Sequence, residues 1–108
     1  MSKKFKTAYV VERGKVYNAD AIIQYADEVV FLLTGKERGE EIERLLRKNL
    51  LTFDPDVDVI ITNGRLLASF VLGTIMKELP YYNLGLYQNK DYTFLRITAE
   101  RTPDATSI

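Results

Sequence analysis

The feature that most constrains the fold of this chain is an alternation of short apolar runs with segments of helical periodicity. Three runs are rich in strand-forming residues and cover Thr7–Glu12, Glu28–Leu33 and Val57–Thr62. The run EVVFLL at 28–33 is almost continuously apolar, which is typical of a strand covered on both faces of a sheet. Each run stops at a turn that contains a glycine. These patterns predict the strands of a parallel sheet, joined by helices.

Segments of helical pattern follow each of these runs. The first covers Asn18–Ala26, with Asn18 as its expected cap and apolar residues at helical spacing. The second, Glu40–Phe53, carries apolar residues on one side and charged residues on the other, and Pro55 stops it. The third, Leu66–Leu79, is followed by Pro80. The chain therefore alternates strand and helix three times.

Two further strand-like segments, Tyr82–Tyr87 and Tyr92–Thr98, flank Asn89-Lys90 and read as a hairpin. The full order predicts an α/β fold: a three-layer, Rossmann-like, mostly parallel sheet that ends in an antiparallel hairpin. We expect one domain over residues 1–108, ordered from about 7 to 98, with a loose tail at 101–108.

Composition narrows the classes of function. Fifteen basic and fifteen acidic residues cancel, so we expect no long nucleic acid and no anionic membrane as partner. The chain has no cysteine and no histidine, which excludes disulfides, the usual zinc sites and imidazole acid-base catalysis. We expect no cofactor and no metal. No signal-peptide pattern and no apolar run of the roughly 18 residues of a membrane span are present, so a cytoplasmic location is predicted, in the host cytoplasm if the protein is viral.

Three predicted turns combine a glycine with a cation, at 12–15, 34–36 and 62–65. Loops after parallel strands share the carboxyl edge of an open sheet, which is where such folds bind ligands. Glycine lets backbone amides approach a phosphate, and a helix start adds unpaired N–H groups. The end of the fourth strand joins the same edge if that strand is parallel to the third. The predicted ligand-binding residues are Arg13, Gly14, Thr34, Gly35, Lys36, Thr62, Asn63, Gly64, Arg65, Tyr87 and Gln88.

Ordinary structural roles remain open for the same residues. Glycine after a strand is common in turns, Asn63 would serve as a helix cap, and a loop cation is often only solvated. Neither the G-x-G-x-x-G pattern nor the phosphate loop of NTPases is present. The carboxylates of Asp54, Asp56 and Asp58 are more typical of a solvated loop than of a metal-dependent phosphoesterase. Tyrosines of the hairpin are more typical of cross-strand pairs than of base stacking.

The third predicted helix is apolar on nearly every side, while Ser69 and Gly73 form a narrow strip of small residues. A helix on one face of a sheet needs only one apolar side. The surplus predicts a homodimer through helix 66–79, with burial under the hairpin as the rival interpretation.

A family resemblance rests on the order of elements, the TNGR turn at 62–65, the apolar helix behind it and the final hairpin. Together they resemble the CRISPR-associated Rossmann fold domains and the small ring nucleases related to them. The stretches KTAYVVERG (6–14) and EVVFLLTGK (28–36) are also similar to the openings of short phage proteins. The resemblance implies a homodimer that binds a cyclic oligoadenylate second messenger across its two-fold axis. The ligand contacts that it implies are Arg13, Thr34, Lys36, Asn63, Gly64 and Arg65.

Ring nucleases of this family cut without a metal, by orienting a ribose 2′-hydroxyl toward the neighbouring phosphate. The resemblance then makes Lys36 and Arg65 the catalytic residues, because they are the cations beside developing negative charge. No residue is marked as a general acid or base. A sponge that binds the nucleotide without cleaving it, and so depletes an antiviral defence signal of the host, fits equally. The alternative from another class is a viral or host protein-interaction module with no small ligand.

Overall fold

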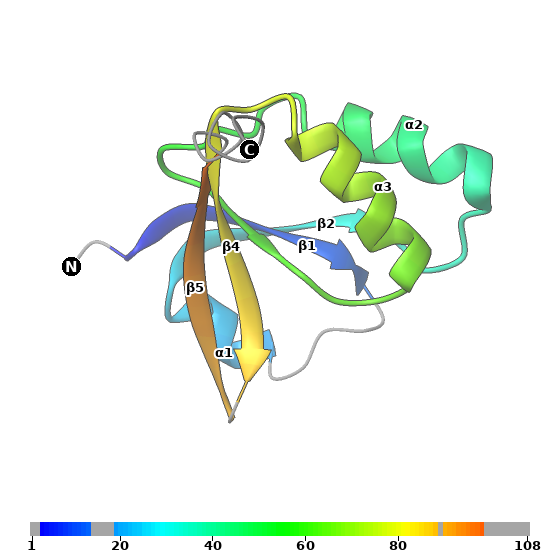
Figure 1. The fold of residues 1–108 in the computed structure, drawn as a ribbon. Helices are drawn as coiled ribbons and strands as arrows, with labels where there is room; N and C mark the ends of the chain where they lie inside the picture. Colours follow the sequence, from blue (N-terminus) through cyan, green and yellow to red (C-terminus); the bar gives the residue numbers. More distant parts are fainter. Residues whose placement is uncertain (1–2, 14–18, 89, 99–108) are drawn as a thin grey trace, which may run out of the picture.

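The computed structural model describes residues 3–13, 19–88 and 90–98. The elements follow the expected order (Figure 1). The expected cap at Asn18 and the expected loose tail at 101–108 lie outside the described residues. The elements are β1 (Phe5–Glu12), α1 (Ala19–Ile23), β2 (Ala26–Leu33), α2 (Gly39–Asn49), β3 (Val59–Ile61), α3 (Leu66–Met76), β4 (Tyr81–Gln88) and β5 (Asp91–Thr98).

The five strands form one sheet in the order β2-β1-β3-β4-β5. The pairs β1–β2, β1–β3 and β3–β4 are parallel, and the β4–β5 hairpin is antiparallel. This confirms the predicted α/β fold with a mostly parallel sheet and a final hairpin. Figure 1 shows a strong twist, with β4 and β5 running across the direction of β1 and β2.

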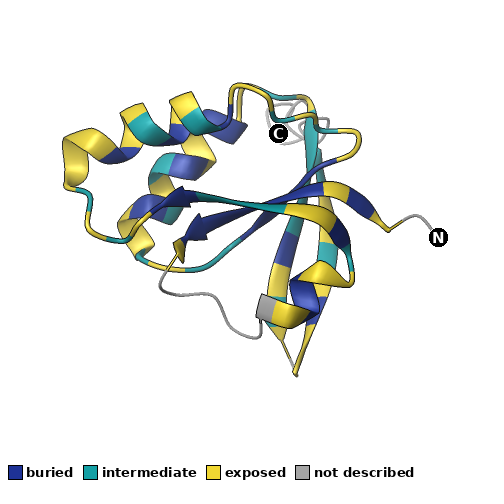
Figure 2. Cartoon of the chain, turned by 180° about the vertical axis from the view of Figure 1, so that it is seen from behind, coloured by how far each residue is buried: buried dark blue, intermediate teal, exposed yellow. Residues whose placement is uncertain are grey.

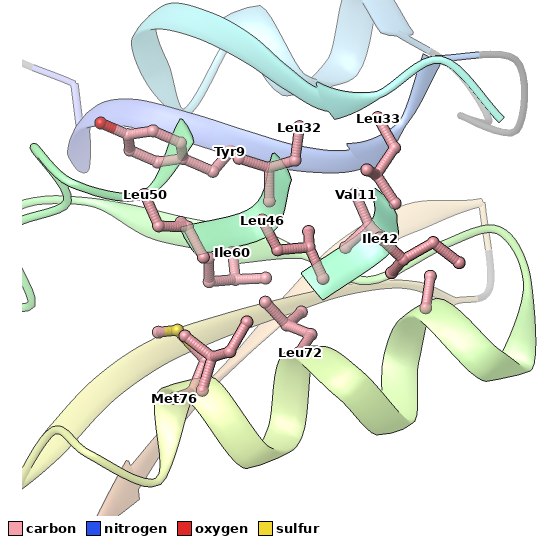
Figure 3. Close-up of a cluster of buried hydrophobic side chains, with 12 residues drawn as sticks. Tyr9, Val11, Leu32, Leu33, Ile42, Leu46, Leu50, Ile60, Leu72 and Met76 are labelled. Carbon is pink, nitrogen blue, oxygen red and sulfur yellow. The ribbon is translucent and has the colours of Figure 1, made fainter. Parts of the chain in front are cut away.

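Helices cover both faces of the sheet, as a three-layer fold requires. The larger core joins α2 and α3 to one face, where Ile42, Leu46 and Leu72 meet Tyr9 and Ile60 (Figure 3). The other face forms a second core in which Ala21 and Ile22 of α1 pack with residues of β1, β3 and β5. Figure 2 shows that the buried residues concentrate in the central strands and on the inner sides of the helices.

Several element boundaries differ from the predicted ones. Helix α1 stops at Ile23, because Ala26 already pairs with Phe5 in the sheet. Helix α2 ends at Asn49, and the expected helical residue Phe53 instead packs its ring 5.4 Å from that of Tyr9. Tertiary packing overrides local preference at the ends of these two helices. In the hairpin turn, Lys90 has a positive φ of 69°, and Asn89 lies outside the described residues.

The loop between α2 and β3 explains the acidic cluster at 54–58. Asp58 is buried and accepts hydrogen bonds from the backbone N–H of Thr7 at 3.1 Å and of Asp54 at 2.8 Å. Burial raises the pKa of the Asp58 carboxyl. Asp58 therefore holds the loop in place at the amino edge of the sheet.

Among the described helices, none has the length and apolar character needed to cross a bilayer.

Candidate functional site

The turns that follow β1, β2 and β3 lie at one edge of the sheet, as expected. Glu12 pairs with Leu33, so β1 and β2 end at the same level, and Ile61, the last residue of β3, pairs with Val10, two residues before the end of β1. The chain moves from β1 to β2 on one side and reaches β3 on the other, which makes the β1–β3 boundary a topological switch point. This edge is the candidate site.

Glu12 occupies the centre of this edge. Its side chain is fully buried, although it is an acid at the very end of β1. Its Oε1 accepts hydrogen bonds from the backbone N–H of Arg65 at 2.6 Å and from Arg65 Nε at 3.1 Å. Burial of an unpaired carboxylate costs several kcal/mol, so this pairing keeps the charge inside the fold.

The glycines of the two neighbouring turns make room for the Glu12 carboxylate. Gly64 has a φ of 85°, and a Cβ at that position would stand 2.5 Å from Glu12 Oε1. Gly35 has a φ of 102°, and a Cβ there would stand 3.1 Å from Glu12 Oε2. Both positions need glycine for its conformational freedom and for the close approach. The two predicted phosphate-binding glycines therefore surround a carboxylate that belongs to the chain.

The side chain of Asn63 forms hydrogen bonds with both the backbone N–H and the backbone carbonyl of Glu12. Asn63 Oδ1 accepts a hydrogen bond from the Glu12 N–H at 3.0 Å, and Asn63 Nδ2 donates one to the Glu12 carbonyl at 2.8 Å. The side chain thus continues the β1–β3 pairing beyond Ile61. The N-cap of α3 is Arg65, so Asn63 is not the cap that the ordinary structural interpretation assigns to it.

Glu37 fills the turn after β2. Its carboxylate accepts hydrogen bonds from the backbone N–H and the hydroxyl of Thr34, both at 2.9 Å, and from the N–H of Gly35 at 3.0 Å. Burial raises the pKa of the Glu37 carboxyl, but these hydrogen bonds outweigh it and lower the pKa to about 2. An ionised side chain of the protein itself therefore occupies the anion position of this turn.

Arg65 joins the two carboxylates. Its Nη1 donates a hydrogen bond to the carbonyl of Glu37 at 2.6 Å, and its Nη2 lies 3.6 Å from Glu37 Oε1. Nη2 is buried and has no hydrogen-bond partner among the described residues. The guanidinium is thus directed into the protein, toward Glu12 and Glu37, and its expected contact with a ligand stays a prediction.

Two expected cations remain exposed at this edge. The Arg13 guanidinium carbon lies 4.4 Å from the centre of the Phe31 ring, a cation–π geometry. Lys36 is exposed in the turn after β2. A hollow of about 290 Å³ is lined in part by Arg13, Phe31, Thr34 and Glu37. Gly14, the remaining residue expected in the first turn, lies outside the described residues.

Three other predicted residues are not part of this cluster. Thr62 uses its N–H and its hydroxyl to bind the carbonyl of Gly85, at 3.0 and 3.1 Å. Tyr87 packs edge-on against Tyr92 in the second core, and Gln88 pairs with Asp91 at the hairpin tip. Figure 1 shows that β4 ends near α1, away from the turn before α3. The twist of the sheet carries the end of β4 away, although β4 is parallel to β3.

Within the part of the chain that is described, no group of three or more acidic, histidine or cysteine side chains could hold a metal ion. A larger hollow, about 370 Å³, lies near the carboxyl ends of α2 and α3 and is lined mainly by apolar residues. It is remote from the Glu12 cluster.

The two carboxylates of the cluster were not among the predicted site residues. A signal for Glu37 exists, because Thr34-Gly35-Lys36-Glu37 matches the pattern in which a threonine binds an acid three residues later. The signal for Glu12 is weaker: one acid ends an apolar strand and precedes an arginine. Its actual partner, Arg65, is 53 residues away.

No family model, curated protein or solved structure matches this chain.

Proposed function

We propose that this protein binds a cyclic oligonucleotide second messenger at the carboxyl edge of its sheet. The observation that carries the proposal is the frame around Glu12. This buried carboxylate is bonded to the turn after β3, whose Arg65 in turn binds the turn after β2, so that both turns have a fixed geometry. Prearranged groups bind phosphates with little loss of conformational freedom. The site also lies at the switch point, where folds of this kind bind ligands.

The proposal assigns different roles to the cations. Arg13 and Lys36 are exposed and available to phosphate groups, and the backbone N–H groups of the first turn of α3 add to the positive field. Arg65 is a positioning residue, because its guanidinium is held by Glu12 and Glu37. The carboxylate of Glu37 lowers the positive potential at the site, so each single phosphate is attracted weakly. A ligand with several phosphates is therefore favoured, because it contacts several cations at once.

Slow cleavage of the ring without a metal is the catalytic form of the proposal. The 2′-hydroxyl of one ribose attacks the adjacent phosphorus and loses its proton to water, the bond from phosphorus to the 5′-oxygen breaks, and that oxygen takes a proton from water, which leaves a 2′,3′-cyclic phosphate and a 5′-hydroxyl. Lys36 is the exposed cation that stabilises the charge on the phosphate in the transition state. Alignment of the ribose hydroxyl with the phosphorus accounts for the rest of the rate acceleration. A sponge has the same contacts without this alignment.

Calorimetric titration with cyclic tri-, tetra- and hexa-adenylate and with cyclic dinucleotides tests the proposal. We expect one ring size to bind in the micromolar range or tighter. Mass spectrometry of the same mixtures after long incubation then separates a sponge from a slow ring nuclease. Heats indistinguishable from dilution across the whole panel overturn the proposed function.

A second candidate is a protein-interaction module, and one observation favours it. Leu66 and Phe70 of α3 are exposed for 71% and 68% of their surface, so the rival interpretation, burial of this helix under the hairpin, does not hold within the described chain. Exposed apolar side chains that gather in this way mark interaction surfaces. Capture of an unrelated protein through this surface, together with silence in the nucleotide panel, favours this candidate.

A further inference from the structure

We infer that the outer side of α3 and the open face of the β4–β5 hairpin form a self-complementary interface between two copies of this chain. The inference concerns a different surface from the Glu12 cluster and does not rest on nucleotide binding. Its starting point is an apolar area with two parts, a projecting helix side and an uncovered stretch of sheet.

The projecting part is the side of α3 that faces away from the core. Ala68, Leu72, Ile75 and Met76 are buried, whereas Leu66 and Phe70 point outward and are exposed. Helix α3 contains no charged residue over Leu66–Met76. An exposed helix side without charges is unusual for the surface of a monomer.

The uncovered part lies on the hairpin, on the same side of the sheet as α3. Leu84 packs against the core that contains Leu72 and Met76, so its side of β4 is the α3 side. Leu86 is two residues along β4 and shares this side, and Leu95 of β5 is directly opposite Leu84. Leu86 and Leu95 are nevertheless exposed for 49% and 60% of their surface. Helix α3 therefore leaves the outer part of this sheet face uncovered.

The flank of α3 that carries Ser69 and Gly73 is open as well. Gly73 has no neighbouring atom within 4 Å of where a Cβ would stand. Ser69 lies one turn earlier on the same flank, so a second helix can approach the backbone of α3 closely here. In the inferred dimer, a two-fold axis brings two α3 helices together at this flank, and Phe70 of each copy covers Leu86 and Leu95 of the other.

A second copy is the occupant that the surface fits best. The uncovered hairpin needs an uncharged apolar helix to cover it, and α3 is an uncharged apolar helix that needs an apolar surface to cover its outer side. The α3 helix of each copy covers the hairpin of the other. The four exposed side chains, Leu66, Phe70, Leu86 and Leu95, are uncharged, so their burial carries no cost of desolvating a charge. These four side chains offer on the order of 400 Å² per copy, about half of what a standard interface buries on each partner. The polar rim supplies the rest.

Light scattering after size-exclusion chromatography tests the interface. We expect the wild-type chain to elute with twice the monomer mass at micromolar concentration. Phe70→Glu and Leu95→Lys should each weaken the dimer by at least about 30-fold, because each puts a charge into its apolar centre. Leu51→Lys is the matched control: Leu51 is exposed for 81% of its surface beyond α2, outside the interface, and should leave the mass unchanged. Circular dichroism confirms that each variant is folded.

Mixing the two single variants tests the arrangement itself. In a mixed dimer, the carboxylate that Phe70→Glu introduces into one chain meets the ammonium group that Leu95→Lys introduces into the other. This contact forms on one side of the axis, and the native residues meet on the other side. We expect the equimolar mixture to recover the mass of a dimer that neither variant forms alone. A wild-type monomer, dissociation by Leu51→Lys, or no recovery on mixing overturns the inference.

Discussion

Glu12 and Arg65, 53 residues apart in the chain, are joined at the carboxyl edge of the sheet by two hydrogen bonds to one carboxylate oxygen. The backbone N–H of Arg65 donates at 2.6 Å and its Nε at 3.1 Å. The carboxylate is fully buried and the guanidinium continues to Glu37. The turns after β2 and β3 therefore take their positions from a single ion pair at the end of β1.

Glu12→Gln should lower the free energy of unfolding by about 2 to 4 kcal/mol, because it leaves Arg65 with a partner that has no charge. Urea unfolding measures the change. Glu43→Gln is the control, since Glu43 pairs with Arg47 on the exposed side of α2 and its loss should cost less than about 1 kcal/mol. Equal effects of the two substitutions contradict the central role of Glu12.

Gly64→Ala should destabilise the fold by more than about 2 kcal/mol, because an alanine there adopts an unfavourable positive φ and its Cβ collides with the Glu12 carboxylate. Gly39→Ala tests the same change at the start of α2, where no atom lies within 4 Å of the new Cβ, and should be neutral or stabilising. Thermal unfolding compares the two, and a neutral Gly64→Ala shows that the turn is free to move.

The Glu37 carboxylate makes stability depend on pH. Its pKa in the folded chain is about 2, below its ordinary value of 4.5, so the ionised form stabilises the fold above about pH 4.5. This contribution, on the order of 1 to 3 kcal/mol, is lost as the pH falls toward about 2. Glu37→Gln should remove that part of the pH dependence. Unfolding curves for wild type and variant that change in parallel over this range disprove the assignment.

Lys36→Ala should weaken binding of the cyclic oligonucleotide by about 5- to 20-fold, because it removes an exposed cation from the proposed site. Lys48→Ala removes another exposed lysine, on α2, and serves as the control. Both affinities come from calorimetry at one fixed salt concentration. If both variants lose the same affinity, the effect comes from net charge and the site lies elsewhere.

Much of the fold follows from local patterns. The apolar run at 28–33 and the glycine turns after each strand predict parallel strands with a shared carboxyl edge, and the register of Glu12 with Leu33 agrees. The burial of Glu12 could not be predicted, because a single acid at the end of a strand is usually solvated. Only its pairing with a residue 53 positions away makes burial possible.

The remaining differences also come from long-range geometry. Tyr87 and Gln88 end a strand parallel to β3, so a flat sheet would place them at the site, but the twist directs β4 toward α1. Helix α3 was correctly expected to be apolar all round. Whether the hairpin covers it depends on how far α3 extends across the sheet, which periodicity does not encode.

The most direct test of the central claim is a titration of the ¹⁵N-labelled protein with the cyclic oligoadenylates, followed by amide chemical shifts. The account predicts that one ring changes the amide chemical shifts of Gly35, Lys36, Gly64 and the first turn of α3. The amide chemical shifts around the hollow at the carboxyl ends of α2 and α3 should not change. Unchanged spectra with every ring, or shifts confined to that hollow, contradict it.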